Sequence, residues 1–382
     1  AQIVIMDDIT ANTIWSANNE YLLDGLIFVD STITLTIEAG TIIKAKESAS
    51  ITTGDGASAL IIRRGAKLIA DGNAQNPIIF TSEFDDINNP NDLLPSDNEL
   101  WGGVILLGSA TTNQPDNNTQ IEGIPLTENA RYGGTNDDDN SGILRYISIR
   151  HGGFSISGIP GDEINGLTMG AVGRNTVIEH IEVFANKDDG YEWFGGTVNC
   201  KWLVAAMCGD ECFDWDQGYR GMGQFWFGIQ ADFEAGKGME MDGGDDCETC
   251  MPFAEPTIVN LTLIGAGVGN SPGGDQNELA LHFRDNSGGH FYSSIITDFV
   301  SDGIIIEDLT SGEDSRQRLD DGDLSLEHIY WWNFGVTNEL DSIAKQDFVA
   351  TYLTGTGTNF IADPQLGNIS RDQSGSLDPR PL

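Results

Sequence analysis

The sequence is poor in positive charge. It has 19 Lys plus Arg against 59 Asp plus Glu in 382 residues, a formal net charge of −40 at pH 7. Such a surface repels phosphate backbones and anionic lipid, so the composition argues against nucleic-acid binding and against a membrane-surface role. The same surface attracts cations. It fits either a chain that stays soluble in a saline medium or a chain with specific calcium sites.

Long apolar runs and helical periodicity are also scarce. No run approaches the ~18 residues of a membrane span, so we expect no membrane-spanning segment. A helical pattern is convincing only over 340–353 ("LDSIAKQDFVATYL"), which predicts a short C-terminal helix. Strand-like runs rich in Ile, Val, Thr and aromatics fill the remainder, and the 47 glycines permit tight turns between them. The predicted fold class is therefore all-β.

Cysteine is infrequent, with five in the chain. Four of them form two close pairs, Cys208 with Cys212 in "CGDEC" and Cys247 with Cys250 in "CETC". Zinc sites use similar spacings, but both pairs lie in acidic loops, which favours disulfides in an exported protein. The connectivity stays open. Cys200 lies in a strand-like run and is predicted to be a buried thiol.

What the sequence does have is a repeat. "DDGYEWFGG", "DECFDWDQG" and "KGMEMDGG" carry Glu192, Asp214 and Glu240 at equivalent places, with steps of 22 and 26 residues. Strand-like runs recur at roughly this period through the chain. A period of 20 to 30 residues is too short for a βαβ unit and suits one turn of a parallel β-helix, a solenoid in which successive turns stack.

The repeat predicts a right-handed parallel β-helix as one domain over 15–365. Residues 1–14 precede it as an N-terminal strand or extension, and 366–382 follow as a polar tail. Two Asn-, Asp- and Pro-containing stretches, about 83–100 and 111–141, interrupt the pattern as inserted loops. We further expect the apolar start "QIVIM" to pair with a strand edge, in this chain or in a neighbouring subunit.

Side chains alternate between core and solvent along a strand, so aligning the repeats sorts them into columns. The inward columns are Tyr191, Phe213, Met239, Leu281, Ile304 and Trp193, Trp215, Met241, Phe283, Ile306. The outward columns are Glu192, Asp214, Glu240, His282, Ile305 and Phe194, Asp216, Asp242, Arg284, Glu307. The inward columns are apolar throughout, whereas the outward columns form an acidic ladder.

At this point the chain resembles a known family. The motifs are "LTIEAGTIIKAK", "ALIIRRGAKLIADGNAQNPIIFTS", "WGGVILLGSA", "YGGTNDDDNSGILRYISIRHGG", "INGLTMGAVGRNTVIEHIEVFANKDDGYEWFGG" and "FDWDQGYRGMGQFWFGIQ". They are similar to secreted right-handed parallel β-helix proteins of the pectate-lyase-like superfamily from Bacteroidota and related marine bacteria. That family has no established activity. Its members often continue past "LDPRP", so we expect a C-terminal sorting or anchoring piece beyond this sequence.

The ladder has two interpretations. Neighbouring turns lie about 4.8 Å apart, so Asp214 would face Glu240, and Asp216 would face Asp242; stacked carboxylates repel unless a proton or a cation intervenes. Calcium suits such oxygen ligands. In pectate-lyase-like proteins, carboxylates on adjacent turns hold calcium while an arginine removes a proton, which the resemblance would assign to Arg284. The other interpretation is a solvated ladder balanced by Arg284 and bound calcium or sodium, with His282 beside Glu240.

A second calcium candidate is "NDDDNSG", residues 136–142. Asp137, Asp139 and Ser141 precede a glycine, as in the first half of an EF-hand loop. Position 148 is Ser rather than the closing Glu, so a true EF-hand is not predicted. A partial calcium loop and an ordinary acidic turn remain open.

The sequence therefore supports three functions. The first is an exported, calcium-stabilised structural or cell-surface protein that self-associates, for example as a filament subunit. The second is a calcium-dependent polysaccharide lyase or glycoside hydrolase, with Arg284, His282, Asp216 and Asp242 as the candidate catalytic residues. The third is a carbohydrate-binding protein without catalysis. The start "AQIVIMDD" resembles the product of signal cleavage, which predicts a secreted, extracellular or cell-surface location.

Overall fold

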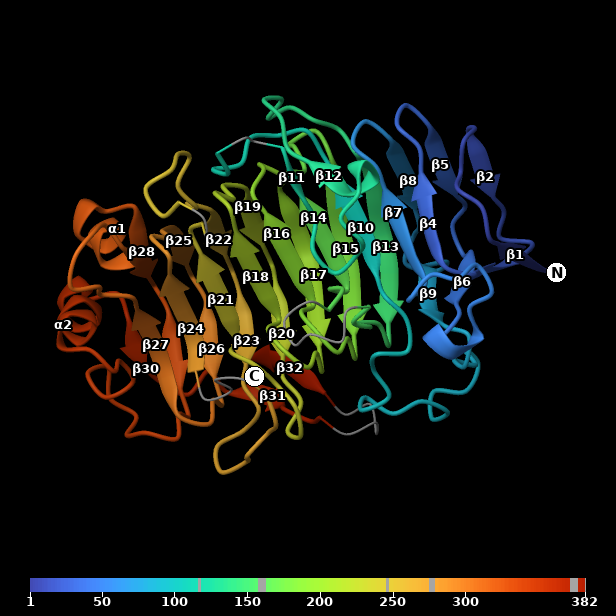
Figure 1. Ribbon diagram of the computed structural model, residues 1–382. Helices are drawn as coiled ribbons and strands as arrows, with labels where there is room; N and C mark the ends of the chain where they lie inside the picture. The colour runs from blue at the N-terminus through green and yellow to red at the C-terminus, as the bar shows by residue number, and fades with distance from the viewer. Residues whose placement is uncertain (116–117, 157–162, 245–246, 275–278, 372–376, 382) are drawn as a thin grey trace.

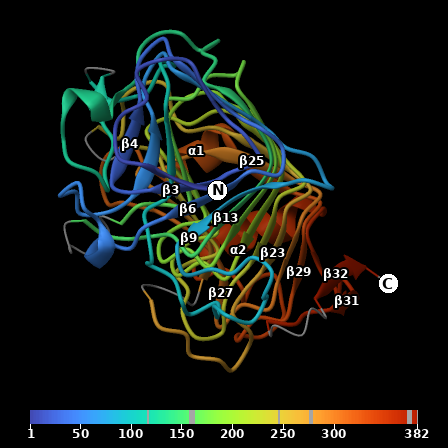
Figure 2. The same ribbon diagram turned by 90° about the vertical axis from the view of Figure 1, so that its right-hand side faces the viewer.

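The computed structural model describes residues 1–115, 118–156, 163–244, 247–274, 279–371 and 377–381. The chain winds into a right-handed parallel β-helix whose turns stack from the N-terminal to the C-terminal end (Figure 1). Seen along the stack, each turn has three faces (Figure 2), which we call sheets I, II and III. All neighbouring strands within these three sheets run parallel.

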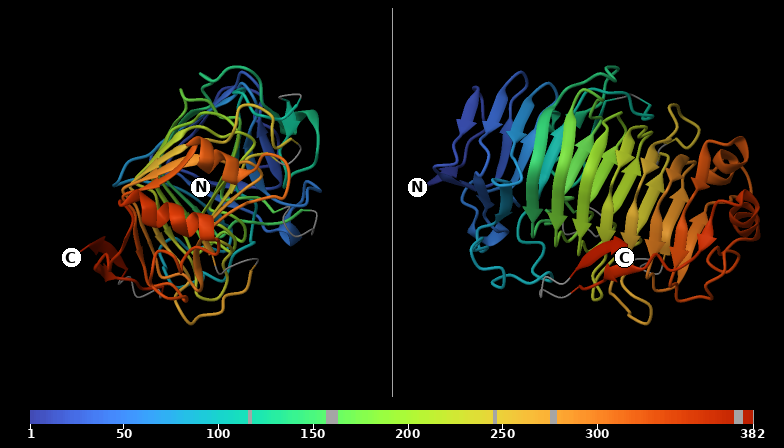
Figure 3. Two further views of the ribbon diagram at one scale, coloured as in Figure 1. Left: turned by 90° about the vertical axis from the view of Figure 1, so that its left-hand side faces the viewer. Right: turned by 180° about the vertical axis from the view of Figure 1, so that it is seen from behind.

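Sheets I and II contain the strands that precede each sheet III strand. Sheet I comprises β2 (Thr13–Trp15), β5 (Thr34–Ile37), β8 (Lys67–Asp71), β19 (Met222–Gln224), β22 (Thr257–Val259), β25 (Gly289–Tyr292) and β28 (Leu324–Glu327). Sheet II comprises β1 (Gln2–Ile5), β3 (Glu20–Leu23), β6 (Ile42–Ala45), β9 (Ile78–Ser82), β20 (Phe227–Ile229), β23 (Thr262–Ile264), β26 (Ile295–Thr297), β29 (Tyr330–Trp332) and β30 (Phe360–Ile361). The long strands β13 (Gly142–Arg150), β15 (Val177–Phe184) and β17 (Cys200–Ala206) bend and run through both sheets (Figure 3, right).

Sheet III carries the repeats that the sequence singled out. It comprises β4 (Leu26–Val29), β7 (Ala59–Ile62), β10 (Val104–Leu107), β14 (Leu167–Gly170), β16 (Tyr191–Phe194), β18 (Phe213–Asp216), β21 (Met239–Asp242), β24 (Leu279–Arg284) and β27 (Asp302–Ile306). The register pairs Tyr191 with Phe213, Phe213 with Met239, Met239 with Leu281 and Leu281 with Ile304. The predicted alignment is thereby confirmed, and its two inward columns are fully buried in the core.

The two long connections lie where the insertions were expected. Residues 83–100 follow β9 on the way to β10. Residues 111–141 follow β10 and contain the antiparallel pair β11 (Thr119–Gln120) and β12 (Arg131–Tyr132) with a 3-10 turn, η2 (Glu128–Ala130), between them. This second insertion packs an apolar cluster that includes Ile121, Ile124 and Tyr132 onto the outer side of sheet III. Another 3-10 turn, η1 (Ser48–Ser50), follows β6.

The first residues belong to the stack. β1 pairs with β3 and β2 with β5, while Ile9 forms a bridge to Val29 of sheet III. "QIVIM" therefore pairs within its own chain, one of the two partners considered. β1 is the edge strand of sheet II. Its side chains therefore do not alternate between buried and exposed positions, and its apolar residues are largely exposed.

The other end of the stack is covered by helices α1 (Ser315–Asp321) and α2 (Asp347–Thr356) (Figure 3, left). α2 is the predicted C-terminal helix, although it begins seven residues later than the pattern suggested. α1 was not predicted, because its apolar content is too low to show a helical period. Its termini do carry sequence signals: the Asp314 side chain accepts from the Gln317 amide, and Gly322 ends the helix in a left-handed conformation.

The polar tail predicted over 366–382 contains two short strands. β31 (Leu366–Asn368) and β32 (Asp378–Pro381) form an antiparallel pair that lies beside the middle of the stack (Figure 1). Leu366 packs with Ile229 and Ile264 on the outside of sheet II. Arg371 donates to the backbone oxygen of Gln230 at 3.1 Å and pairs with Asp298 at 2.8 Å. These contacts join residues that are 73 or more positions apart in the sequence, so no local pattern predicts them.

Candidate functional site

The acidic ladder lies on the outer side of sheet III, as predicted. Glu192, Asp214, Glu240 and His282 occupy one register position on β16, β18, β21 and β24. Two residues further along the same strands, Asp242 pairs with Arg284. The sheet therefore brings together the carboxylates and the basic side chains that the sequence placed in the outward columns.

The ladder is partly shielded from solvent, with buried and half-buried members, which argues against the interpretation as a solvated ladder. Glu192 is 8% exposed, Asp216 5% and Glu240 9%. The second insertion folds over this face: the Tyr132 hydroxyl donates to Oε1 of Gln217 at 2.7 Å, directly after β18. The Asn165 amide donates to the Glu192 carboxylate. The carboxylates thus lie under a cover, where charge is costly.

Carboxylates from the turns before β16 and β18 extend the ladder and were not among the predicted site residues. Three groups of side chains have one ligand atom each within 4.8 Å of the others among the described residues. These groups are Asp188, Asp189, Asp210, then Asp189, Glu192, Asp214, then Glu211, Asp214, Glu240. The signal was present in the quoted repeats, since "DDG" and "DEC" hold the same place before two successive strands. We call these residues, with Asp216 and Asp242, the acidic cluster.

Burial and mutual repulsion shape the protonation of the acidic cluster. Burial raises the pKa values of Glu192 and Asp214 well above their ordinary range, and neighbouring carboxylates raise them further. The same causes raise the pKa of Asp210 to about 6. The pKa values of Asp188, Asp189, Glu211 and Asp242 are raised in the same way. With protein groups alone, these side chains hold protons at pH values where isolated carboxylates are ionised.

The pKa of Glu240 shifts in the opposite direction because the basic side chains of the site surround this carboxylate. Burial opposes its charge, but His282, Lys237 and Arg284 lower its pKa to about 2. The Lys237 ammonium lies 3.0 Å from Oε2 of Glu240 and 3.4 Å from Oε1 of Glu211, and its side chain is only 4% exposed. His282 Nδ1 lies 3.3 Å from Oε1 of Glu240.

Arg284 is held entirely by acids. Its Nη1 lies 3.0 Å from Oε1 of Glu240, and its Nε lies 3.3 Å from Oδ1 of Asp242 and 3.2 Å from Oδ2 of Asp285. Burial would lower its pKa, but these carboxylates raise it instead. A guanidinium in this position keeps its proton, so the geometry suits charge balance and opposes a role as a general base.

The "NDDDNSG" turn lies apart from these groups. Both Oδ atoms of Asp137 lie 2.9 Å from Nη2 of Arg220, and the Thr111 amide donates to the same carboxylate at 3.0 Å. Despite partial burial, these partners lower the pKa of Asp137. Asp139 accepts from the Ser109 hydroxyl at 2.7 Å and the Ser141 hydroxyl at 3.0 Å. Protein donors thus bind the oxygens that a calcium loop would need, which favours the acidic-turn interpretation.

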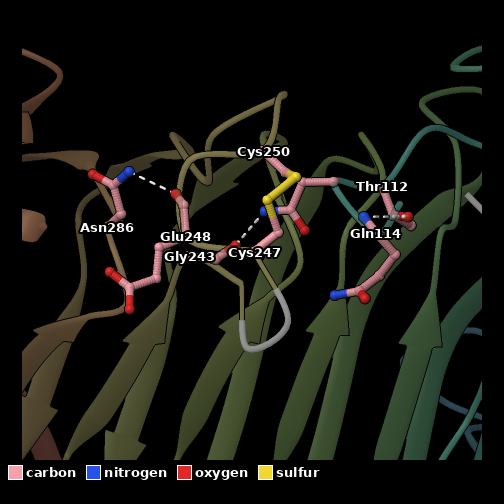
Figure 4. The surroundings of a disulfide bond; sticks show 8 residues. Thr112, Gln114, Gly243, Cys247, Glu248, Cys250 and Asn286 are labelled. Atoms are coloured by element: carbon pink, nitrogen blue, oxygen red, sulfur yellow. Dashed lines mark hydrogen bonds between the residues drawn. A yellow bond between two sulfur atoms is a disulfide. The ribbon is translucent and has the colours of Figure 1, made fainter. Parts of the chain in front are cut away.

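The cysteine pairs have different outcomes. Cys247 and Cys250 form a disulfide in the turn after β21 (Figure 4). Neighbouring contacts fix this turn: Asn286 Nδ2 donates to the backbone oxygen of Glu248 at 2.6 Å. Cys208 and Cys212 are free, so the disulfide predicted for them is wrong. Both point into the hydrophobic core, where they pack as small apolar side chains, as does the free Cys200.

Comparison with known families agrees with this architecture. A family model described as a pectate-lyase-like β-helix domain matches residues 7–365. The chain belongs to the pectate-lyase-like β-helix family. Neither the comparison with curated proteins nor that with solved structures gives a match. Membership in this β-helix family fits a polysaccharide-related or cell-surface protein. Among the described residues, no helix has the length and apolar character needed to cross a membrane.

Proposed function

We propose that this protein is an exported, calcium-stabilised β-helix with a structural role at the cell surface. The observation that carries the proposal is the acidic cluster, in which buried carboxylates from successive turns lie within ligand distance of one another. The buried Lys237 and the half-buried Arg284 balance only part of this charge. A divalent cation among the oxygens would remove the repulsion that raises the carboxylate pKa values.

Calcium is the cation that suits this chemistry. The ligands are carboxylate oxygens from several turns and strands, and calcium accepts six to eight such oxygens with adaptable geometry. Asp189, Glu192 and Asp214 form the most promising group, because the paired positive side chains lie further along the ladder, around Glu240. Ionised ligands bind the cation and neutral ones do not, so occupancy would increase as the cluster loses its protons.

The same geometry gives less support to the alternative function, a polysaccharide lyase. Asp216, Asp242 and Arg284 lie on neighbouring strands, as that function requires, but Arg284 is bound to three carboxylates and its pKa is raised. The cover provided by residues 111–141 also restricts access to this face. Incubation with polygalacturonate and calcium over a range of pH values would detect a lyase through unsaturated ends. We expect no product.

The proposed function is tested by thermal unfolding with calcium and with chelator at matched ionic strength. Binding to the folded state alone stabilises by RT ln(1 + [L]/Kd), about 2.7 kcal/mol at a hundredfold excess over Kd. We expect calcium to raise the melting temperature. Asp214→Asn should raise it in chelator, because the variant removes repulsion, and should reduce the gain from calcium, because it removes a ligand.

The matched control is Asp341→Asn, the same change at an exposed position after the last sheet III strand. It should leave both melting temperatures unchanged. Equal melting temperatures of the unmodified protein with calcium and with chelator would refute the proposal. If calcium raises the melting temperature of Asp214→Asn as much as that of the unmodified protein, the cation binds at another site.

A further inference from the structure

The corner between sheets I and II has an unusual composition. In successive turns the chain bends there at a single residue with positive φ. These residues are Tyr146 (48°), His180 (55°), Trp202 (54°), Phe225 (59°), Asn260 (61°), Ser293 (53°) and His328 (59°). The register on both sides of the corner places them one above another along the stack. The backbone at this corner is therefore constant while the side chain changes.

The first four of these residues are aromatic or imidazole rings, which the backbone does not favour. A left-handed conformation suits Gly and Asn, and it is strained for bulky side chains. The core does not require the rings either, because Trp202 is 39% exposed and Phe225 43% exposed. Strain that neither the backbone nor the core explains is typical of a functional site.

The rings form a continuous stack, which we call the aromatic column: Tyr146, His180, Trp202 and Phe225. Ring centroids are 4.4 Å apart between Tyr146 and His180, 4.3 Å between His180 and Trp202, and 6.0 Å between Trp202 and Phe225. The planes are parallel within 9°. Because each ring covers the face of the next, the column presents a strip of ring edges along the stack axis.

A groove of about 440 Å³ runs beside this strip on the outer side of sheet II. All four rings line it, and its floor includes Glu182, which the Ser148 hydroxyl contacts at 2.6 Å. Arg150 Nε donates to the same hydroxyl at 2.7 Å. A second hollow, of about 320 Å³, shares Arg150 and Glu182 and is walled by residues of the 83–100 loop. Together they form a trough with one aromatic wall and a floor that is polar at Arg150 and Glu182 and apolar at Val204 and Phe227.

We propose that this trough binds a neutral polysaccharide chain lying along the stack axis. Sugar rings have apolar C–H surfaces and polar hydroxyls, and the trough offers an aromatic wall for the first and the Glu182 carboxylate and the Arg150 guanidinium for the second. The turns repeat about every 4.8 Å, which is close to the length of one sugar residue in an extended chain. A net charge of −40 repels polyanionic polysaccharides, which disfavours an acidic polysaccharide as the ligand.

This site is separate from the acidic cluster. The trough lies on sheet II and its corner with sheet I, whereas the acidic cluster lies on sheet III and the turns before it. Binding of a polysaccharide here needs no cation and no catalytic group. The inference therefore goes beyond the proposed function, and each can fail without the other.

Titration calorimetry on the full chain tests the inference, with cellohexaose, xylohexaose and mannohexaose as neutral probes and oligogalacturonate as the acidic comparison. We expect at least one neutral probe to bind. Trp202→Ala should weaken that binding about tenfold or more, because the variant removes half-exposed apolar contact surface from the wall of the trough. Phe360→Ala is the matched control: Phe360 is an aromatic residue of similar exposure, 44%, on β30 near the end of the stack. It should leave binding unchanged.

A second variant, Glu182→Gln, keeps the shape of the trough and removes a strong acceptor. It should also weaken binding, while the melting temperature confirms that each variant is folded. The inference is overturned if no neutral probe binds, if Trp202→Ala binds as the unmodified protein does, or if Phe360→Ala has the same effect as Trp202→Ala. Tighter binding of oligogalacturonate than of every neutral probe would overturn the assignment of an uncharged ligand.

Discussion

At the residue scale, the aromatic column shows that the backbone conformation at the corner between sheets I and II does not determine which side chain stands there. Phe225 holds a left-handed conformation, and the next turn places Asn260 at the same corner position. Asn is among the residues that adopt this conformation most easily. The corner can therefore be built without an aromatic ring, as the later turns of this chain show.

The variant Phe225→Asn tests this at the level of stability. Relief of backbone strain contributes about 1 kcal/mol, and the loss of stacking on Trp202, 6.0 Å away, costs about 0.5–1.5 kcal/mol. These terms nearly cancel, so we expect the free energy of unfolding in urea to change by less than about 1 kcal/mol. The buried Phe291→Ala is the control and should cost about 3–5 kcal/mol. A loss above about 2 kcal/mol for Phe225→Asn would make the ring structural.

Lys237, in contrast to Phe225, is a buried residue whose side chain we expect the fold to need. Its ammonium is buried between Glu211 and Glu240. Lys237→Met would leave both carboxylates without this partner, which costs about 3–5 kcal/mol for a buried pair. We expect a loss of that size in chelator by chemical denaturation, and a smaller loss in calcium if the cation stabilises the cluster.

Lys67→Met, at an exposed position of β8, is the control for Lys237→Met. Its effect should stay within about 0.5 kcal/mol, as is usual for surface substitutions. If both variants lose equally little, the Lys237 ion pairs do not stabilise the fold.

At the element scale, the 83–100 loop is attached to the stack partly through one histidine. His151 follows β13 and is buried, with Nδ1 2.6 Å from the backbone oxygen of Asp97. That oxygen only accepts, so Nδ1 carries the hydrogen. The imidazole also lies edge-on to Phe184, with ring centroids 5.6 Å apart. The attachment of the loop thus depends on a buried, neutral imidazole.

The buried His151 predicts that its contribution to the stability of the fold depends on pH. Burial lowers the pKa of His151, with Arg150 contributing in the same direction. Below an unfolded value of about 6.5 the unfolded chain takes up a proton that the folded protein does not, so this contribution to stability is lost as the pH falls. The raised pKa values of the acidic cluster act in the opposite direction in both proteins, so we expect His151→Gln to gain stability relative to the unmodified protein between pH 7 and pH 5.5. His328→Gln, at an exposed corner position, should keep the original slope.

The cysteines give a second prediction for the elements that contain them. Cys200, Cys208 and Cys212 are buried thiols, and burial raises the pKa values of Cys200 and Cys208 to about 12. A thiol reagent should therefore find no reactive cysteine in the folded protein. After denaturation without reductant it should find three, because Cys247 and Cys250 are bonded to each other. A count of one would instead indicate a second disulfide among these three cysteines.

At the scale of the whole molecule, the two ends of the stack are unlike. The C-terminal end is covered by α2, which buries Val349 and Leu353 against the core. At the other end the edge strand β1 and the neighbouring β2 carry exposed apolar side chains, including Val4 and Ile14. An open strand edge with exposed apolar residues is a surface that pairs with another chain.

The exposed end predicts that the protein self-associates through it. We expect light scattering at micromolar concentration with calcium to give a mass above that of the monomer, and Val4→Lys to return the mass to the monomer value. Leu126→Lys adds the same charge at an exposed apolar position of the second insertion and should change nothing. A monomeric unmodified protein under these conditions would contradict the prediction.

The sequence by itself determined the β-helix and the register of sheet III. Tyr191, Glu192 and Trp193 alternate in the same way as the equivalent residues of the next two turns. A slip of one residue would bury the carboxylates in the core and expose the aromatic rings, so the alternation permits one alignment. The outward column of acids followed directly from that alignment, because it depends on neighbours along a single strand.

Only the tertiary structure decided the burial and the protonation of those outward residues. The cover over the ladder rests on contacts such as Tyr132 with Gln217, which are 85 residues apart in the sequence. The merging of turn carboxylates into one cluster and the stacking of Trp202 on His180 likewise join residues from different turns. The strand period says which way a side chain points. Burial, protonation and the shape of a groove depend on what the rest of the chain places opposite it, and a pattern of neighbouring residues does not carry that information.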